Sequence, residues 1–237
     1  MTSVFMLTLR QLSGKWRLVI MTALAAMPVL FTGLLVRSAQ TPDVAEFETI
    51  VLSAMLAGSI APLIIVAIAS VAFANEIEDR TLANLTLAPI PRWQIVAPKL
   101  LAAVTVAGPF IVASAFLTSF IAFNHDMTAT FAVTASAIVG LLLYSSVFLW
   151  LGLVTKQAIG VGLLYIVLWE GFFSGYVSGI RFFSIRHYAT ALMHGLDPRR
   201  FAADEHVGLG VAIGVAVAVF TLFLLLSTRR LRRMDVP

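Results

Sequence analysis

The chain contains no cysteine, and charged side chains make up only 12% of its 237 residues. Without cysteine it forms no disulfide and offers no thiolate as a nucleophile or metal ligand. Apolar residues make up 60% of the sequence, which is more than a soluble domain of this size can bury. These proportions predict an integral membrane protein with a single membrane domain.

Charge of either sign is sparse, with a modest basic excess. Lysine and arginine number 16 against 12 aspartate and glutamate residues, for a net charge of +4. This excess is too small and too dispersed to indicate nucleic-acid binding. It suits a membrane protein with basic cytoplasmic edges.

A nucleotide-binding motif is also missing. A P-loop needs Gly-x-x-x-x-Gly-Lys-Ser/Thr, so that backbone amides can surround the phosphates. Only Gly14-Lys15 supplies the dipeptide, and Leu9 and Trp16 stand where a glycine and a hydroxyl residue are required. We therefore expect this chain to bind no cofactor and to have no catalytic residues of its own.

Protease and metal chemistry are rejected on similar grounds. A rhomboid-type protease needs serine in a Gly-x-Ser-Gly setting and a histidine base on a neighbouring helix. Here Phe172 stands in the first glycine position before Phe173-Ser174-Gly175. The histidines lack the spacing typical of zinc sites and are interpreted as surface residues, namely His125, His187, His194 and His206.

Long apolar runs predict an all-α membrane protein with six transmembrane helices, over residues 18–36, 50–74, 94–123, 129–154, 158–176 and 207–227. The first run has about 19 residues, or about 28 Å at 1.5 Å per residue, which matches the hydrocarbon core. We interpret it as a retained helix rather than a signal peptide, whose apolar core would be shorter. Residues 18–237 would form the membrane domain.

Residues 1–17 are amphipathic and predict a helix that lies in the membrane interface. Phe5, Leu9, Leu12 and Trp16 follow steps of four, three and four, so they share one helical face. Trp16 would lie at headgroup depth. The alternative is a polar lead-in to the first span.

The basic residues predict that both ends of this multi-pass chain are cytoplasmic, because lysine and arginine are enriched in cytoplasmic loops. In that orientation the inner side carries Arg10, Lys15, Arg17, Arg80, Arg92, Lys99, Lys156, Arg229, Arg230, Arg232 and Arg233. The outer side carries fewer, namely Arg37, Arg181, Arg186, Arg199 and Arg200.

The longest polar interruption of the first half spans residues 75–101, between the second and third expected spans. Its charges begin with Glu76, Glu78, Asp79 and Arg80. Thr81 to Ala88 then predicts a short helix, with Leu82 and Leu85 three residues apart on one face. Pro89 and Pro91 end it, because the residue before a proline is pushed out of the helical region. A short helix that carries leucines indicates a surface for another protein, whereas the alternative is a solvated loop.

This stretch resembles the first cytoplasmic loop of type-2 ATP-binding-cassette (ABC) exporter permeases. The resemblance rests on Glu-x-Glu-x-x-Thr-Leu at 76–82, Leu85, Pro-Ile-Pro-Arg-Trp at 89–93 and Lys-Leu-Leu at 99–101; the usual pattern has glycine at the position of Arg80. In that family the loop carries a coupling helix that docks on a separate ATPase. The resemblance therefore implies ATPase coupling by Glu76, Glu78, Asp79, Arg80, Thr81, Leu82, Leu85 and Arg92.

The resemblance also implies the function and the assembly. The chain would be the permease subunit of an ATP-driven exporter in the plasma or inner membrane, with ATP and magnesium on the partner ATPase. Two permease copies, surrounded by membrane lipid, would enclose the translocation path, and an external re-entrant hairpin would follow the fifth span. A secondary transporter or channel without an ATPase, and a membrane assembly or anchoring protein, remain as alternatives.

Glu170 is the one acidic residue inside an expected span, where such residues are costly and face an interior, a cavity or a partner. One interpretation is a residue of the translocation path or gate. Another is an interface glutamate paired with Arg181 or another basic residue of the hairpin, and a third is a glutamate that reaches the headgroups. Glycines near it permit close helix approach, which favours the fifth helix as a surface between two copies.

Overall fold

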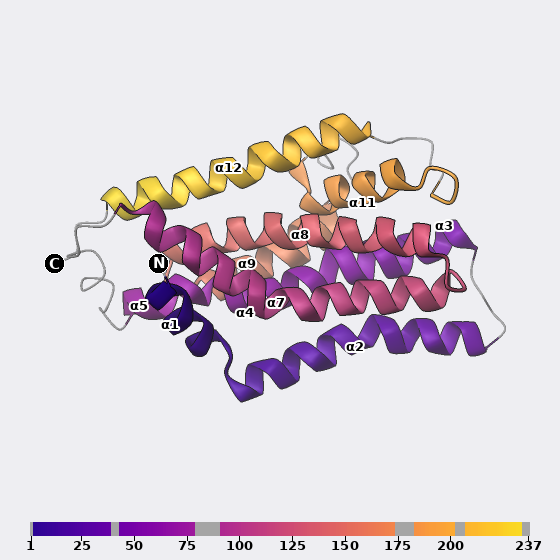
Figure 1. Ribbon diagram of the computed structural model, residues 1–237, viewed down its shortest axis with the longest axis horizontal. Helices are drawn as coiled ribbons and strands as arrows, with labels where there is room; N and C mark the ends of the chain where they lie inside the picture. The colour runs from indigo at the N-terminus through magenta and orange to yellow at the C-terminus, as the bar shows by residue number, and fades with distance from the viewer. Residues whose placement is uncertain (1, 39–42, 79–90, 174–182, 202–206, 234–237) are drawn as a thin grey trace.

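The computed structural model describes residues 2–38, 43–78, 91–173, 183–201 and 207–233. The regular structure of these residues is entirely helical (Figure 1). The elements are α1 (Thr2–Leu12), α2 (Lys15–Arg37), α3 (Val44–Phe47), the π-helix η1 (Glu48–Ile60), α4 (Ala61–Ala69), α5 (Val71–Glu78), α7 (Trp93–Ala122), α8 (Met127–Val154), α9 (Ala158–Leu164), the π-helix η2 (Tyr165–Phe173), α11 (Ile185–Leu196) and α12 (Leu209–Arg233).

Five helices of the described chain are long and apolar enough to cross a membrane, namely Lys15–Arg37, Val44–Ala74, Trp93–Ala122, Met127–Val154 and Leu209–Arg233. The shorter apolar helix Ala158–Phe172 occupies the place of the expected fifth span, 158–176. The structure describes that stretch only as far as Phe173. An all-helical protein with five candidate spans is therefore established, and the count of six stays a prediction.

The long helices run side by side, so that distant parts of the chain gather at two ends (Figure 1). One end, here called the α1 end, holds α1, α5, the start of α7 and the C-terminal end of α12. The opposite end, here called the α3 end, holds α3, the C-terminal end of α2 and the turn between α7 and α8. This is the grouping that the predicted topology requires.

The core of the bundle lies among α4, α7 and α8. Their buried apolar side chains form one continuous cluster that includes Ile64, Ile65, Ile68, Ile95, Ile111 and Leu149. The outer helices are different, because α12 is only 6% buried over its most apolar window, against 56% for α8. A helix that is apolar on all sides but exposed suits a lipid environment.

The N-terminal amphipathic segment differs from the prediction in its boundary. Gly14 is extended, with φ −63° and ψ 133°, so that α1 ends before α2 begins at Lys15. Leu12 is fully buried and Leu9 packs on the core cluster, where α1 contacts α7. Trp16 lies instead on α2 and is 80% exposed. The expected face of Phe5, Leu9, Leu12 and Trp16 is thus divided between two helices, and its interfacial position stays a prediction.

The second span consists of η1, α4 and α5 rather than one regular helix. The π-helix gives way to α4 near Pro62, which has no N–H to donate to the preceding turn of the continuous helix. Ser70 lies between α4 and α5 with helical backbone angles of φ −66° and ψ −33°, and its hydroxyl donates to the carbonyl of Val66. Gly152 of α8 crosses there, and a Cβ on it would lie 2.2 Å from the Ser70 carbonyl oxygen. Only glycine permits so close a crossing.

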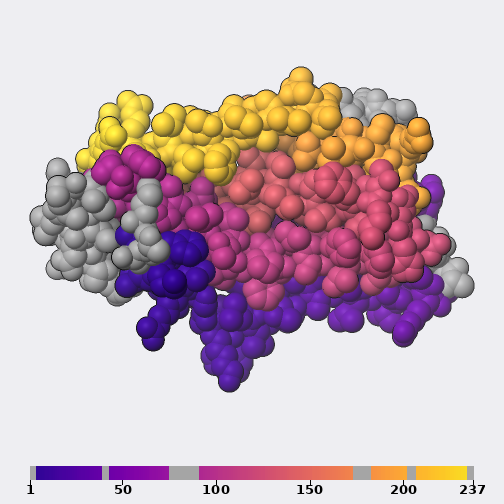
Figure 2. All heavy atoms as spheres, viewed as in Figure 1, coloured from indigo at the N-terminus to yellow at the C-terminus, as the bar shows by residue number. Residues whose placement is uncertain are grey.

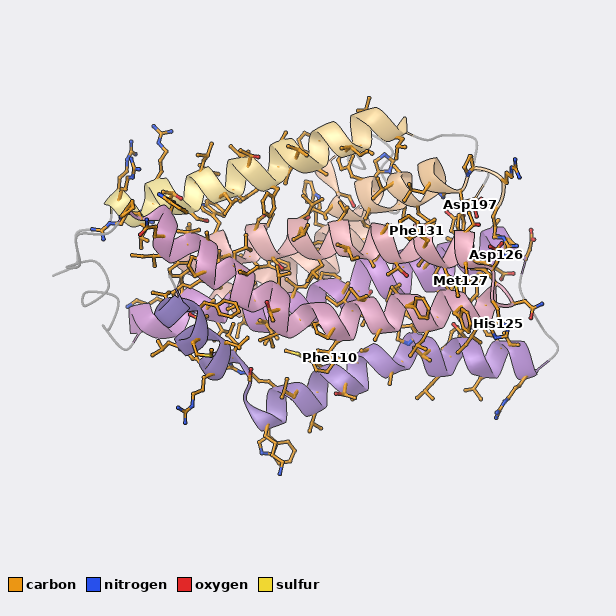
Figure 3. All side chains as sticks on the ribbon, in the orientation of Figure 1. Phe110, His125, Asp126, Met127, Phe131 and Asp197 are labelled. Carbon is orange, nitrogen blue, oxygen red and sulfur yellow. The ribbon has the colours of Figure 1, made fainter. Side chains whose placement is uncertain are left out.

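A tight turn joins α7 to α8 at the α3 end, between the expected spans 94–123 and 129–154. Asn124 and His125 have positive φ angles of 51° and 67°. Asp126 caps α8, because its carboxylate accepts a hydrogen bond from the N–H of Thr128 at 2.9 Å. It also pairs with Arg200 at 3.0 Å. Figure 3 labels His125, Asp126 and Asp197, all at this end.

Candidate functional site

The segment predicted to contact an ATPase leaves the bundle from α5 and returns at α7, both at the α1 end (Figure 1). Part of it lies outside the described residues, namely Asp79, Arg80 and the predicted helix Thr81 to Ala88 with Leu82 and Leu85. The backbone places Glu76 and Glu78 in the second half of α5, and Arg92 immediately precedes α7. The structure therefore places the two ends of the predicted segment and leaves its docking helix untested.

The start of α7 is a tight turn built from Pro91, Arg92 and Trp93 of the motif. The N–H of Gln94 donates to the carbonyl of Pro91 at 2.9 Å, and that of Ile95 to the carbonyl of Arg92 at 3.0 Å. These three-residue spacings are typical of a 3₁₀ turn at a helix end. Trp93 is half-exposed beside them. The returning chain thus enters the bundle in a defined direction.

Basic side chains gather at the same end. The described ones are exposed or partly exposed, apart from Lys99, and comprise Arg10, Lys15, Arg17, Arg92, Lys156, Arg229, Arg230, Arg232 and Arg233. Figure 2 shows α1, the start of α7 and the end of α12 close together at this end, and α7 contacts both other helices. The α3 end carries Arg37, Arg199 and Arg200. That the basic end faces the cytoplasm stays a prediction.

Glu170 lies in η2, is fully buried and holds the first turn of α11. Its Oε1 accepts hydrogen bonds from the Tyr165 hydroxyl and the Ile185 N–H, both at 3.0 Å. Its Oε2 accepts one from the Ser184 hydroxyl at 2.5 Å. Ser184 is itself the N-cap, because its Oγ accepts from the N–H of His187 at 3.3 Å. One carboxyl group thus satisfies both the cap residue and a backbone N–H of the helix start.

The other end of α11 is held by a second glutamate. His194, in the last turn, contacts the carboxylate of Glu48, the first residue of η1. Between the two ends, the Ser136 hydroxyl of α8 donates to the carbonyl of Ala189 at 2.6 Å. The helix of the predicted hairpin is therefore bound to the second, fourth and fifth spans.

These contacts can be compared with the three interpretations of Glu170, as a residue of the path, of an interface or of the headgroup region. Three of its hydrogen bonds come from neutral donors of the fifth span and of the hairpin helix, and Arg181 lies outside the described residues. The structure gives Glu170 a role in holding α11 within one protomer. A role in the translocation path, or between two copies, stays a prediction.

Sequence reasoning missed Glu48 and misjudged His194. Glu48 lies just before the expected span 50–74 and was given no role, and His194 was interpreted as a surface residue although it is only 8% exposed. The sequence does hold a signal, because Ser184 precedes an amphipathic run that ends near His194, a pattern typical of a capped helix. No group of three or more acidic or histidine side chains in the described part of the chain could hold a metal ion.

Comparison with known proteins adds the family. A family model described as ABC-2 family transporter protein matches residues 9–186, well over half of the chain. No curated protein matches the chain. The matched region runs from α1 to the start of α11 and includes four of the candidate spans and the motif at 76–101. The chain therefore belongs to the ABC-2 family of transporter proteins.

Proposed function

We propose that the chain is the permease subunit of an ATP-driven exporter, and that residues 79–90 couple it to a separate ATPase subunit. The family supports the first step, because its members are transmembrane subunits of ABC transporters and are generally non-catalytic. One observation carries the coupling step. Of the two helices that flank the segment, α5 ends and α7 begins at the α1 end, where the basic residues gather.

In this proposal the short helix Thr81 to Ala88 offers Leu82 and Leu85 to an apolar groove on the ATPase. Glu76 and Arg92, with the other charged residues of the segment, make ion pairs around that contact and select the partner. ATP and magnesium bind the ATPase. When ATP brings two ATPase subunits together, the segment moves, and the attached α5 and α7 tilt with it.

A second copy of the chain completes the path. We place the contact between copies on the outward face of α9 and η2, where Leu164 is 60% and Val167 is 64% exposed. Gly160 faces open space on the same helix, whereas Gly162 is used for packing against Val66 within the protomer. A large exposed apolar face accepts either lipid or another copy.

The test is Leu85→Asp in the full complex with its ATPase. A charge forced into an apolar groove is desolvated and unpaired, and a penalty of about 3 kcal/mol lowers affinity more than a hundredfold. The ATPase should no longer copurify, or its hydrolysis should become independent of the permease, while the permease still inserts. Gln157→Asp, in the short turn between α8 and α9, is the matched control. Full coupling in Leu85→Asp together with loss in Gln157→Asp would assign coupling to the other turn and refute the proposal.

A further inference from the structure

Lys99 is a fully buried cation next to the proposed coupling segment. It lies on α7 about 9 Å from the first residue of the helix, at 1.5 Å per residue, close enough to the helix end for a lysine to reach water. It does not do so. Its Nζ donates a hydrogen bond to the carbonyl of Ala72 on α5 and lies 4.5 Å from the centre of the Phe73 ring.

Burial of an ammonium group is expensive unless acceptors and aromatic faces surround it. A methionine at position 99 would fill a similar space without that cost. What the ammonium adds is a directed, charge-assisted bond between two helices. Ala72 and Phe73 are both fully buried, so the contact is sealed from water.

The bond between Lys99 and Ala72 joins the two helices that flank the proposed coupling segment. α5 ends at Glu78, just before segment 79–90, and α7 begins at Trp93, just after it. At Ser70, just before α5, the second span keeps helical backbone angles of φ −66° and ψ −33°, but the Ser70 hydroxyl donates back to the Val66 carbonyl, a bond that often bends a helix. Bending at this point would move α5 relative to α7, and the contact between Lys99 and Ala72 opposes that movement.

We propose that Lys99 is a positioning residue of the coupling step, which ties α5 to α7 so that both ends of segment 79–90 move as one unit. The inference rests on the proposed function. Without the tie, movement of the ATPase would bend α5 at Ser70 instead of tilting the two spans. Lys99 then acts through helix geometry and not through contact with the ATPase.

The first test needs no ATPase. Spin labels at Ala74→Cys and Trp93→Cys, in a chain that has no other cysteine, report the distance between α5 and α7 by dipolar EPR. Lys99→Met should broaden the distance distribution, and Lys99→Gln provides a second variant should the first be poorly recovered. Lys156→Met is the matched control, because Lys156 is exposed in the turn at the same end. Distributions in Lys99→Met and Lys99→Gln as narrow as in the unsubstituted protein would overturn the tie.

The second test measures coupling with ATP and vanadate as the probe. In the reconstituted complex, labels at Ser38→Cys and Asn124→Cys report the response at the α3 end. Lys99→Met should still bind the ATPase. The fraction of molecules whose label distance changes with ATP and vanadate should fall about fivefold or more, because coupling between sites commonly has this size. Lys99→Arg, which keeps the cation and its donors, should recover part of the response.

The outcomes separate the inference from the proposed function. A full response in Lys99→Met overturns the coupling role even if the distance between α5 and α7 broadens. If the unsubstituted permease binds no ATPase at all, the proposed function fails and the coupling role with it, while the EPR distances still decide whether Lys99 ties the helices.

Discussion

Removal of the Glu170 carboxyl group should free the N-terminal turn of α11. In Glu170→Ala the buried N–H of Ile185 and the hydroxyls of Tyr165 and Ser184 lose their acceptor. An unpaired buried N–H costs about 1–3 kcal/mol, and each lost hydroxyl hydrogen bond about 0.5–1.5 kcal/mol. The expected loss is therefore about 2–6 kcal/mol, concentrated on one helix end.

Hydrogen exchange measured by mass spectrometry on residues 185–196 would detect this loss. If α11 opens locally, a destabilisation of about 3 kcal/mol speeds exchange more than a hundredfold. Glu170→Gln retains an acceptor oxygen and should give a smaller increase, together with lower transport or weaker pairing of two copies. Insertion into the membrane should persist, because loss of a carboxylate from a span relieves its insertion cost.

Glu46→Ala is the matched control, since Glu46 is exposed in α3 and its loss should leave the exchange of residues 185–196 unchanged. Exchange at the original rate in Glu170→Ala would refute the reasoning. It would mean that the contacts of Glu48 and Ser136 hold α11 without help from the fifth span.

Two further predictions concern packing and topology. Gly152→Ala should lower the free energy of unfolding of the purified permease by about 1–3 kcal/mol, because the added Cβ has no room beside Ser70. Gly160→Ala should have little effect, because Gly160 faces open space. Equal melting temperatures for the two variants would contradict the close crossing at Gly152. An impermeant thiol reagent added to intact cells should label Ser38→Cys and Asn124→Cys, which lie at the α3 end. It should not label Gln157→Cys or Thr228→Cys, which lie at the α1 end. Labelling of the second pair would overturn the orientation.

The sequence by itself determined the class of protein and the approximate position of its spans. Apolar runs predicted helices at 94–123 and 129–154, and the structure has Trp93–Ala122 and Met127–Val154. This succeeds because insertion into lipid depends on the local composition of each segment, residue by residue. Composition also singled out Glu170 as a costly acid and 75–101 as the longest polar interruption of the first half, and the family match covers this stretch.

Only the tertiary structure decided which side chains meet. Glu48 contacts His194 and Lys99 contacts Ala72 across separate helices, and Gly152 crosses α4 and α5 at Ser70. Composition and periodicity give the face of a helix but neither its neighbour nor its depth relative to that neighbour, so a buried lysine and a surface lysine are identical in sequence. The break at Gly14 has a related cause, because packing of α1 against the rest of the bundle sets where that helix ends.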